Sequence, residues 1–170
     1  MRTGEIVRAY VGMGSNLEDP LRQIESAMTA LEALPGSRLV ARSALYWSEP
    51  VGPPGQPRYV NAVVCIETGL SAQGLLQELQ AFERRQGRVR SERWGARTLD
   101  LDLLVYGDLV IDTPELTVPH PRLHERAFVL VPLHDIEPDL SIPGAGTVAQ
   151  LCRAIDRSGV AAADIGGVAC

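Results

Sequence analysis

The residues best suited to chemistry are two aspartates in the run RWGARTLDLDLL, residues 93–104. On a β-strand, side chains two positions apart point to the same face, so Asp100 and Asp102 are expected to project together while their leucine neighbours face a core. Adjacent carboxylates repel each other and favour a cation between them, and Mg²⁺ prefers such hard oxygen ligands. A solvated strand face is the alternative for an isolated Asp-x-Asp pair.

Arginines crowd into the segment just before this pair, although the chain carries a net charge of −5. They are Arg84, Arg85, Arg88, Arg90, Arg93 and Arg97. Planar guanidinium groups grip phosphate oxygens with two hydrogen bonds at once. Carboxylates for magnesium beside arginines for phosphate indicate phosphoryl transfer. The alternative is that Glu83 and Glu92 simply pair with these arginines on a wet surface.

The composition narrows the possible classes. The 170 residues are 45% apolar and 22% charged, which is typical of one folded domain spanning 1–170. The chain contains no lysine, which excludes P-loop NTPases, protein-kinase-type sites and Schiff-base enzymes. The negative net charge argues against a protein that binds nucleic acid. The apolar runs are too short to span a membrane. The amino-terminal residues lack a secretory pattern, so we expect a cytoplasmic location. We also expect a monomer.

The helices and strands that must position the aspartates can be predicted from the spacing of apolar residues and from the glycines and prolines that end each element. Residues 6–12 are expected to form a strand, and Asp19 to cap a helix that begins at Pro20 and stops at Pro35-Gly36. Strands are expected over 38–47, 59–68 and 99–106. Ser71 is expected to cap a second helix, and residues 84–97 to form a loop.

After the 99–106 strand, Gly107-Asp108 predicts a hairpin turn into residues 109–111. A last helix is expected over 148–155, and residues 161–170 form a small-residue tail expected to be flexible. The predicted fold class is α+β. The order strand, helix, strand, strand, helix, strand is that of a ferredoxin-like βαββαβ antiparallel sheet with flanking helices, followed by a carboxy-terminal hairpin and helix.

The run at 93–104 resembles the signature of the 6-hydroxymethyl-7,8-dihydropterin pyrophosphokinase family of the folate pathway. The resemblance extends, in the family's order and spacing, to YVGMGSN (10–16), PRYVNA (57–62), QGRVR (86–90), LTVPH (116–120), ERAFVL (125–130) and VPL (131–133). It covers nearly the whole chain, and the family's fold is also ferredoxin-like.

The resemblance implies that the pterin's hydroxymethyl oxygen attacks the β-phosphorus of ATP and that AMP is released. It implies two Mg²⁺ ions held by Asp100 and Asp102. Catalytic roles fall on Arg88, Arg97, Asp100 and Asp102. Contacts to ATP fall on Gln80, Glu83, Arg90, Trp94, Arg97, Leu103, Thr117, His120 and Arg126. The pterin pocket falls on Ser48, Val51, Tyr59, Asn61, Trp94 and Phe128.

The sequence departs from the family pattern at three single residues and in the second lid, which is one residue shorter between Arg90 and Glu92. Two segments resemble the family's mobile lids. Glu49 stands where a proline is common, and Glu115 and Pro121 replace an arginine and an aromatic residue. The segments 48–58 and 86–96 resemble loops that close over ATP.

Two other functions fit parts of the sequence. One is a metal-dependent phosphodiesterase or nuclease built on the aspartate pair, which the negative net charge disfavours. The other is a non-catalytic ferredoxin-like binding module, which leaves the adjacent arginines and aspartates unexplained.

Overall fold

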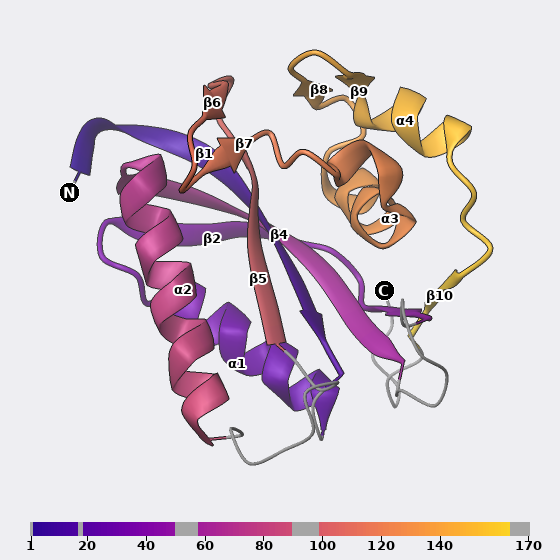
Figure 1. Ribbon diagram of the computed structural model, residues 1–170, viewed down its shortest axis with the longest axis horizontal. Coiled ribbons are helices and arrows are strands. Elements are labelled where there is room, and N and C mark those ends of the chain that lie inside the picture. The colour runs from indigo at the N-terminus through magenta and orange to yellow at the C-terminus, as the bar shows by residue number, and fades with distance from the viewer. Residues whose placement is uncertain (1, 17–18, 50–57, 90–98, 164–170) are drawn as a thin grey trace.

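A six-stranded antiparallel sheet forms the centre of the computed structural model, which describes residues 2–16, 19–49, 58–89 and 99–163. The strand order is β10-β3-β4-β1-β5, and β2 also pairs with β4 (Figure 1). The strands are β1 (Arg2–Ser15), β2 (Ser37–Arg42), β3 (Tyr46–Ser48), β4 (Tyr59–Leu70), β5 (Leu99–Tyr106) and β10 (Val160–Ala162). With β2 and β3 counted as one interrupted strand, this is the predicted ferredoxin-like arrangement.

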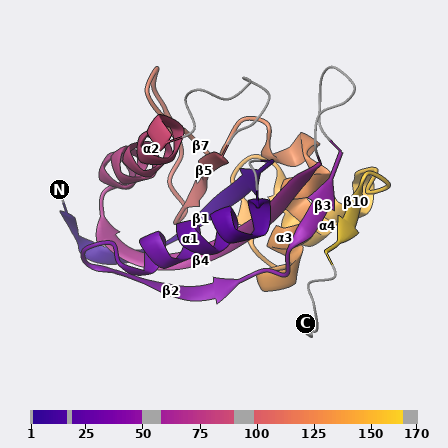
Figure 2. The ribbon, with the colours of Figure 1, turned by 90° about the horizontal axis from the view of Figure 1, so that it is seen from below.

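The two faces of the sheet bury separate cores. Helices α1 (Pro20–Glu32) and α2 (Ala72–Val89) pack on the face that carries Val60, Ala62 and Val64 of β4. Helices α3 (Ala127–Ile136) and α4 (Val148–Ala154) pack on the opposite face, which carries Val63 and Cys65. Figure 2 shows α3 and α4 together beside β3 and β10. The contacts of α3 with the sheet are concentrated on β4, β3 and β10.

Helix α1 begins at the predicted proline but not with the predicted cap. Asp19 occupies the cap position in a left-handed conformation, with φ 57°, and its side chain makes no capping hydrogen bond. Ile24, Met28 and Leu31 form the buried stripe. The helix ends at Glu32, ahead of the turn at Pro35-Gly36.

Helix α2 is longer than predicted. Ser71 caps it as expected, because its Oγ accepts a hydrogen bond from Gly74 N at 3.0 Å. The helix continues to Val89, so the prediction of a loop from residue 84 is wrong for residues 84–89. Polar residues with long unbranched side chains have good helix propensity and extend a helix whose apolar stripe has already nucleated it. Residues 90–97 of that predicted loop lie outside the described residues.

The predicted strand over 38–47 is two strands. Ser43 lies between β2 and β3, donates its backbone N–H to Val63 O, and accepts from Val63 N through its own hydroxyl, both at 2.9 Å. A side-chain oxygen therefore replaces a backbone carbonyl in the ladder, and the strand breaks there. The spacing of apolar residues along the sequence does not reveal that a side chain competes with the backbone for this hydrogen bond.

The predicted hairpin after β5 is wrong. Gly107 adopts φ 56° and a turn forms, but the chain then leaves the sheet. Strand β6 (Ile111–Asp112) pairs with β7 (Thr117–Val118) instead of β5. The glycine predicts the turn correctly, but a turn does not determine which segment becomes the pairing partner.

The carboxy-terminal part largely follows expectation. A short 3-10 helix (Leu123–Glu125) precedes α3, and β8 (Ser141–Ile142) and β9 (Gly146–Thr147) form a hairpin at residues for which none was predicted. Thr147 and Gln150 form a capping box at the start of α4. Val160–Ala162 pairs with β3, so the first residues of the predicted tail form a strand. Residues 164–170 lie outside the described residues. Among described helices, none is long and apolar enough to cross a membrane.

Leu79 of α2 is 1% exposed in the core beneath β5, and its truncation tests this packing. We expect Leu79→Ala to lower the free energy of unfolding by about 2–5 kcal/mol, because a cavity replaces lost contacts. Leu109→Ala is the control, since Leu109 is 47% exposed, and should cost less than about 1 kcal/mol. Urea denaturation measures both, and equal losses would contradict the assigned burial.

Candidate functional site

Asp100 and Asp102 lie on β5 at the edge of the sheet, as the sequence predicts. Leu99, Leu101 and Leu103 are buried between them and α2, whereas Asp100 is exposed and Asp102 half-buried. The alternation predicted for this strand is therefore confirmed, and both carboxylates face the part of the sheet that α3 leaves open.

The register of β4, β1 and β5 places two glycines beside the aspartates. Gly14 pairs with Asp100 on one side and with Asn61 on the other, and Gly12 pairs with Asp102. Directly opposed residues in antiparallel strands present their side chains to the same face. Since glycine has no side chain, the surface between Asn61 and the aspartates is bare backbone.

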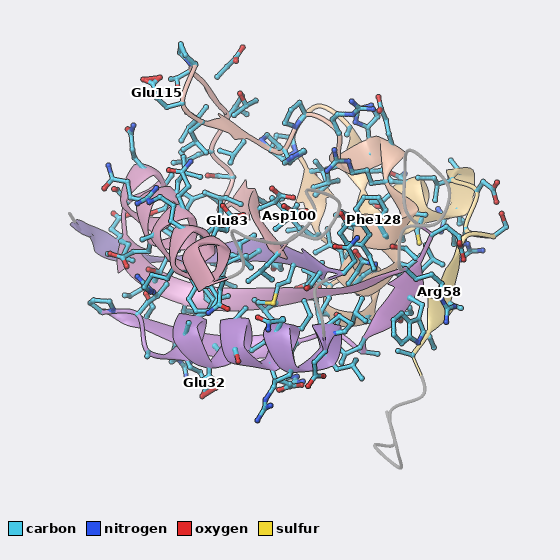
Figure 3. The ribbon with its side chains drawn as sticks, turned by 60° about the horizontal axis from the view of Figure 1, so that its bottom comes forward. Glu32, Arg58, Glu83, Asp100, Glu115 and Phe128 are labelled. Atoms are coloured by element: carbon cyan, nitrogen blue, oxygen red, sulfur yellow. The ribbon has the colours of Figure 1, made fainter. Side chains whose placement is uncertain are left out.

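This bare surface is the floor of a cavity of about 220 Å³. Ser48, Glu49, Tyr59 and Asn61 line it from β3 and β4, Asp100 and Asp102 from β5, and Arg126, Phe128 and Val129 from the start of α3. Figure 3 shows Asp100 between Glu83 of α2 and Phe128 of α3. The Arg126 guanidinium carbon lies 5.6 Å from the centre of the Phe128 ring. The cavity thus combines aromatic, amide and charged groups.

A second cavity of about 260 Å³ lies on the other side of Asp102. Leu76, Gln80 and Glu83 of α2, residues 101–103 of β5, and Glu115, Leu116, Thr117, His120 and Pro121 line it. Asp102 lines both cavities, so one carboxylate stands where they meet.

Glu83 connects α2 to the strand that carries the aspartates. Its Oε2 accepts a hydrogen bond from Leu101 N, between Asp100 and Asp102, at 2.7 Å. Burial raises the pKa of the Glu83 carboxyl, and the charges of Asp100 and Asp102 add to the rise while the Leu101 hydrogen bond opposes it. Glu83 therefore satisfies an N–H at the sheet edge and fixes the backbone between the aspartates.

His120 is tied to the same strand. The pairing of β1 with β5 shifts by one residue between Tyr10 and Val11, which marks a bulge at Leu104. Leu104 O accepts a hydrogen bond from His120 N at 2.8 Å. The bulge thereby attaches the loop of the second cavity directly to β5.

The imidazole of His120 has a defined protonation state. Burial lowers the pKa of the imidazole, Asp102 opposes this shift, and Arg126 and Arg122 add to it. Its Nδ1 accepts a hydrogen bond from Arg122 N at 3.1 Å. The ring proton is consequently on Nε2, which makes this nitrogen a hydrogen-bond donor.

The two cavities gather the site residues predicted from the sequence in two sets. The first cavity holds Ser48, Tyr59, Asn61, Phe128, Asp100, Asp102 and Arg126, and the second holds Gln80, Glu83, Leu103, Thr117, His120 and again Asp102. Val51, Arg90, Trp94 and Arg97 lie outside the described residues, and Arg88 falls in α2 without a described side chain. The lid segments 48–58 and 86–96 are described only at their ends, with Ser48 in β3 and residues 86–89 in α2.

Some lining residues were not among the predicted site residues. Gly12 and Gly14 form the floor, and the spacing of the two glycines within a strand next to the Asp-x-Asp strand was the available signal. Val129 and Leu76 gave no signal beyond being apolar. The departures from the family pattern also lie at the site, since Glu49 lines the first cavity and Glu115 and Pro121 the second.

The aspartate pair fits magnesium better than a metal that needs a full protein cage. In the described part of the chain no group of three or more His, Cys, Asp or Glu side chains could hold a metal ion. Two exposed or half-buried carboxylates beside a cavity suit Mg²⁺, which takes few protein oxygens and keeps water and phosphate oxygens.

Comparison with known proteins identifies relatives over most of the chain. The family model of 7,8-dihydro-6-hydroxymethylpterin-pyrophosphokinase matches residues 10–138. The 2-amino-4-hydroxy-6-hydroxymethyldihydropteridine pyrophosphokinase of Pseudomonas aeruginosa is 50% identical over 155 residues, which are 91% of this chain and 96% of that protein. The enzyme of the same name from Haemophilus influenzae is 48% identical over 148 residues, 87% of this chain and 92% of that one.

Solved structures share the fold at low sequence identity. Wild-type Plasmodium falciparum HPPK-DHPS, crystallised with pterin and p-hydroxybenzoate, has a TM-score of 0.67 at 13% identity. The match covers 88% of this chain but only 43% of that longer one. The family match, the identity to whole bacterial enzymes and the shared fold agree: the chain belongs to the 7,8-dihydro-6-hydroxymethylpterin-pyrophosphokinase family, the pyrophosphokinases of folate biosynthesis.

Proposed function

We propose that this chain transfers the pyrophosphoryl group of ATP to the hydroxymethyl group of 6-hydroxymethyl-7,8-dihydropterin, with the ring in the first cavity and the nucleotide in the second. The observation that carries this assignment is the position of Asp102, which lines both cavities. A group that passes from one substrate to the other must do so where the two sites meet, and that junction carries a carboxylate.

The first cavity has the chemistry that a pterin requires. Tyr59 and Phe128 offer aromatic rings to a flat bicycle, and Asn61 offers an amide to its hydrogen-bonding edge. Ser48 lies beside Asn61 and, on the family resemblance, Val51 and Trp94 complete this pocket. The glycine floor lets the ring approach the backbone of β1.

The second cavity has the chemistry of a nucleotide site. Gln80 and Thr117 supply neutral polar groups, and Nε2–H of His120 supplies a donor suited to a phosphate oxygen. Leu103 lines the same cavity, and Arg126 brings a positive charge from the first. Glu83 is assigned to orientation of the β5 backbone as well as to the nucleotide. By resemblance, Arg88, Arg90 and Arg97 add phosphate contacts.

Asp100 and Asp102 are assigned as the ligands of two magnesium ions. When bound, magnesium would neutralise phosphate oxygens and lower the pKa of the attacking hydroxyl. The chain itself supplies position: the walls of the two cavities hold the hydroxymethyl oxygen and the β-phosphorus on either side of Asp102. The new bond joins that oxygen to the β-phosphorus, the bond between the β-phosphorus and the oxygen of the α-phosphate breaks, and AMP leaves.

The remaining expectations stay predictions. We propose that residues 1–170 act as one pyrophosphokinase domain, as a monomer, in the cytoplasm, on small molecules alone. The nuclease and the non-catalytic module considered from the sequence gain no support, because neither explains two cavities joined at an aspartate.

Product analysis tests the reaction. Incubation with Mg²⁺, ATP and 6-hydroxymethyl-7,8-dihydropterin should release AMP and pyrophosphorylate the pterin in equal amounts, as measured by chromatography. Omission of the pterin, or removal of the metal with EDTA, should abolish AMP release. AMP that forms equally without pterin would contradict the proposal.

Substitution of the aspartates tests the metal assignment. Asp102→Ala and Asp100→Ala should each lower kcat by roughly 10²- to 10³-fold, about 3–4 kcal/mol, because preorganised charge compensation is lost. Asp108→Ala is the matched control, since Asp108 is exposed in the turn after β5 and lines neither cavity. Near-normal turnover in both site variants would refute the assignment.

Substitution of Gly14 tests the floor of the pterin pocket. A Cβ on Gly14 would stand 3.1 Å from Asn61 Oδ1 and 3.7 Å from Tyr59 Cδ2. Gly14→Ala should therefore raise KM for the pterin at least about tenfold while KM for ATP changes little. Gly159→Ala is the control, because a Cβ on Gly159 would meet nothing within 4 Å. A larger effect on ATP than on pterin would place the ring elsewhere.

A further inference from the structure

Strand β10 is the terminal strand of the described sheet on the side of the first cavity, next to β3 (Figure 2). Its residues pair with Tyr46, Trp47 and Ser48 of β3, and the same three residues pair with β4. β3 is therefore a strand of only three residues that has a partner on each side. It reaches the first cavity at its last residue, Ser48, which lines the cavity.

The backbone of β3 divides its hydrogen bonds between these two partners. Ala163 N, directly after β10, donates to Leu45 O at 2.8 Å. Hydrogen-bonded positions in an antiparallel pair recur at every second residue, so the N–H and C=O of Ala161 are directed at Trp47. The backbone groups of the two residues that flank Trp47 are then directed at β4. β10 is thus the strand that satisfies the backbone of the middle residue of β3.

β10 also lies against the side chain that β3 contributes to the cavity. Val160 is directly opposite Ser48, and opposed residues in antiparallel strands present their side chains to the same face. Ser48 is only 5% exposed, although it ends a short strand. At the other end of β3, the hydroxyl of Tyr46 donates to Asp135 of α3 and ties that end to the helix. The Ser48 end is held by its pairing with β4 and β10.

The second cavity is built from other elements. It is lined by residues of α2, β5 and the segment 115–121, and none of its described lining residues belongs to β3, β4 or β10. A change in the pairing of β10 with β3 should therefore alter the first cavity and leave the second as it is.

We propose that β10 is a positioning element for the first cavity, in which Ala161 acts through Trp47 to hold the Ser48 end of β3. This inference rests on the proposed function, in which the pterin ring occupies the first cavity. The pairing fixes one wall of the cavity before the pterin binds, so the pterin does not have to order that wall. The affinity for the pterin thus depends on a strand that lies outside the cavity, whereas the affinity for ATP does not.

Proline substitutions at neighbouring positions of β10 test the proposal. Ala161→Pro removes the N–H that is directed at Trp47. Ala162→Pro is the matched control, because it removes an N–H on the outer side of β10, where the described sheet has no further strand. Both alanines are exposed, so the two variants differ mainly in the side of the strand that loses its donor.

The expected result is a selective loss of pterin affinity. Ala161→Pro should raise KM for the pterin at least about fivefold, while KM for ATP changes less than about twofold, as measured by steady-state kinetics. Ala162→Pro should leave both KM values within about twofold of the wild type. A strand that only stabilises the fold would lower the Tm without separating the two KM values. A pterin KM unchanged in Ala161→Pro, or raised no more than KM for ATP, would overturn the proposal.

Hydrogen exchange in the wild-type protein keeps the test independent of how well Ala161→Pro folds. Because coupling is reciprocal, a pterin that binds better when β10 is paired must also strengthen that pairing. With Mg²⁺ and α,β-methylene ATP present, the pterin should slow exchange of the Trp47 amide at least about fivefold more than that of the Ala149 amide. The Ala149 amide donates to Pro138 O, and neither residue lines a site cavity. Equal slowing of the two amides by the pterin would contradict the coupling.

The two levels of the proposal fail differently. If the wild-type protein releases no AMP from ATP and the pterin, the proposed function is wrong whatever β10 does. If the wild-type protein is active and Ala161→Pro keeps its pterin KM, only the positioning role is wrong.

Discussion

The site depends on the antiparallel register that β1 imposes on its two neighbours. Because β1 is hydrogen-bonded to β4 on one side and to β5 on the other, Gly14 stands between Asn61 and Asp100, and Gly12 stands beside Asp102. A shift of one residue in either pairing would move the whole set of side chains to the opposite face of the sheet. The cavity is therefore a product of register and of two missing side chains, and the start of α3 adds a further wall.

Attachments at the sheet edge then hold β5 in place. β5 is the terminal strand of the described sheet, so its outer N–H and C=O groups have no strand partner there. Glu83 accepts the N–H of Leu101, and the bulge at Leu104 gives its carbonyl to His120. Two elements that line the second cavity thus also satisfy the backbone of the strand that carries the aspartates. Glu83, Asp100 and Asp102 are close enough that their negative charges repel one another, and a bound cation would reduce this repulsion.

Much of this could be predicted from the sequence, for identifiable reasons. The alternation of Leu99 to Leu103 determined which way Asp100 and Asp102 point. Pro20, the Ser71 cap and the apolar stripes located the starts of α1 and α2. The predictions that were wrong concern segments where hydrogen bonds to nearby residues compete with hydrogen bonds to residues distant in the sequence. Ser43 breaks a strand because its hydroxyl reaches Val63, and residues 111–112 pair with the distant residues 117–118 rather than with the adjacent β5. Likewise, no pattern along the chain could show that Gly14 separates Asn61 from Asp100, because that neighbourhood exists only across three strands.

The bulge at Leu104 has a further consequence for how the enzyme can vary. It attaches the loop of His120 to β5, so Asp102 and the walls of the second cavity belong to one unit formed by α2, β5 and that loop. Ser48, Tyr59 and Asn61, which line the first cavity, belong to another unit, formed by β3 and β4 and held by its own hydrogen bonds. The two units meet across the glycines of β1. Substitutions in one unit can therefore reshape the first cavity while the hydrogen bonds that build the second cavity stay intact.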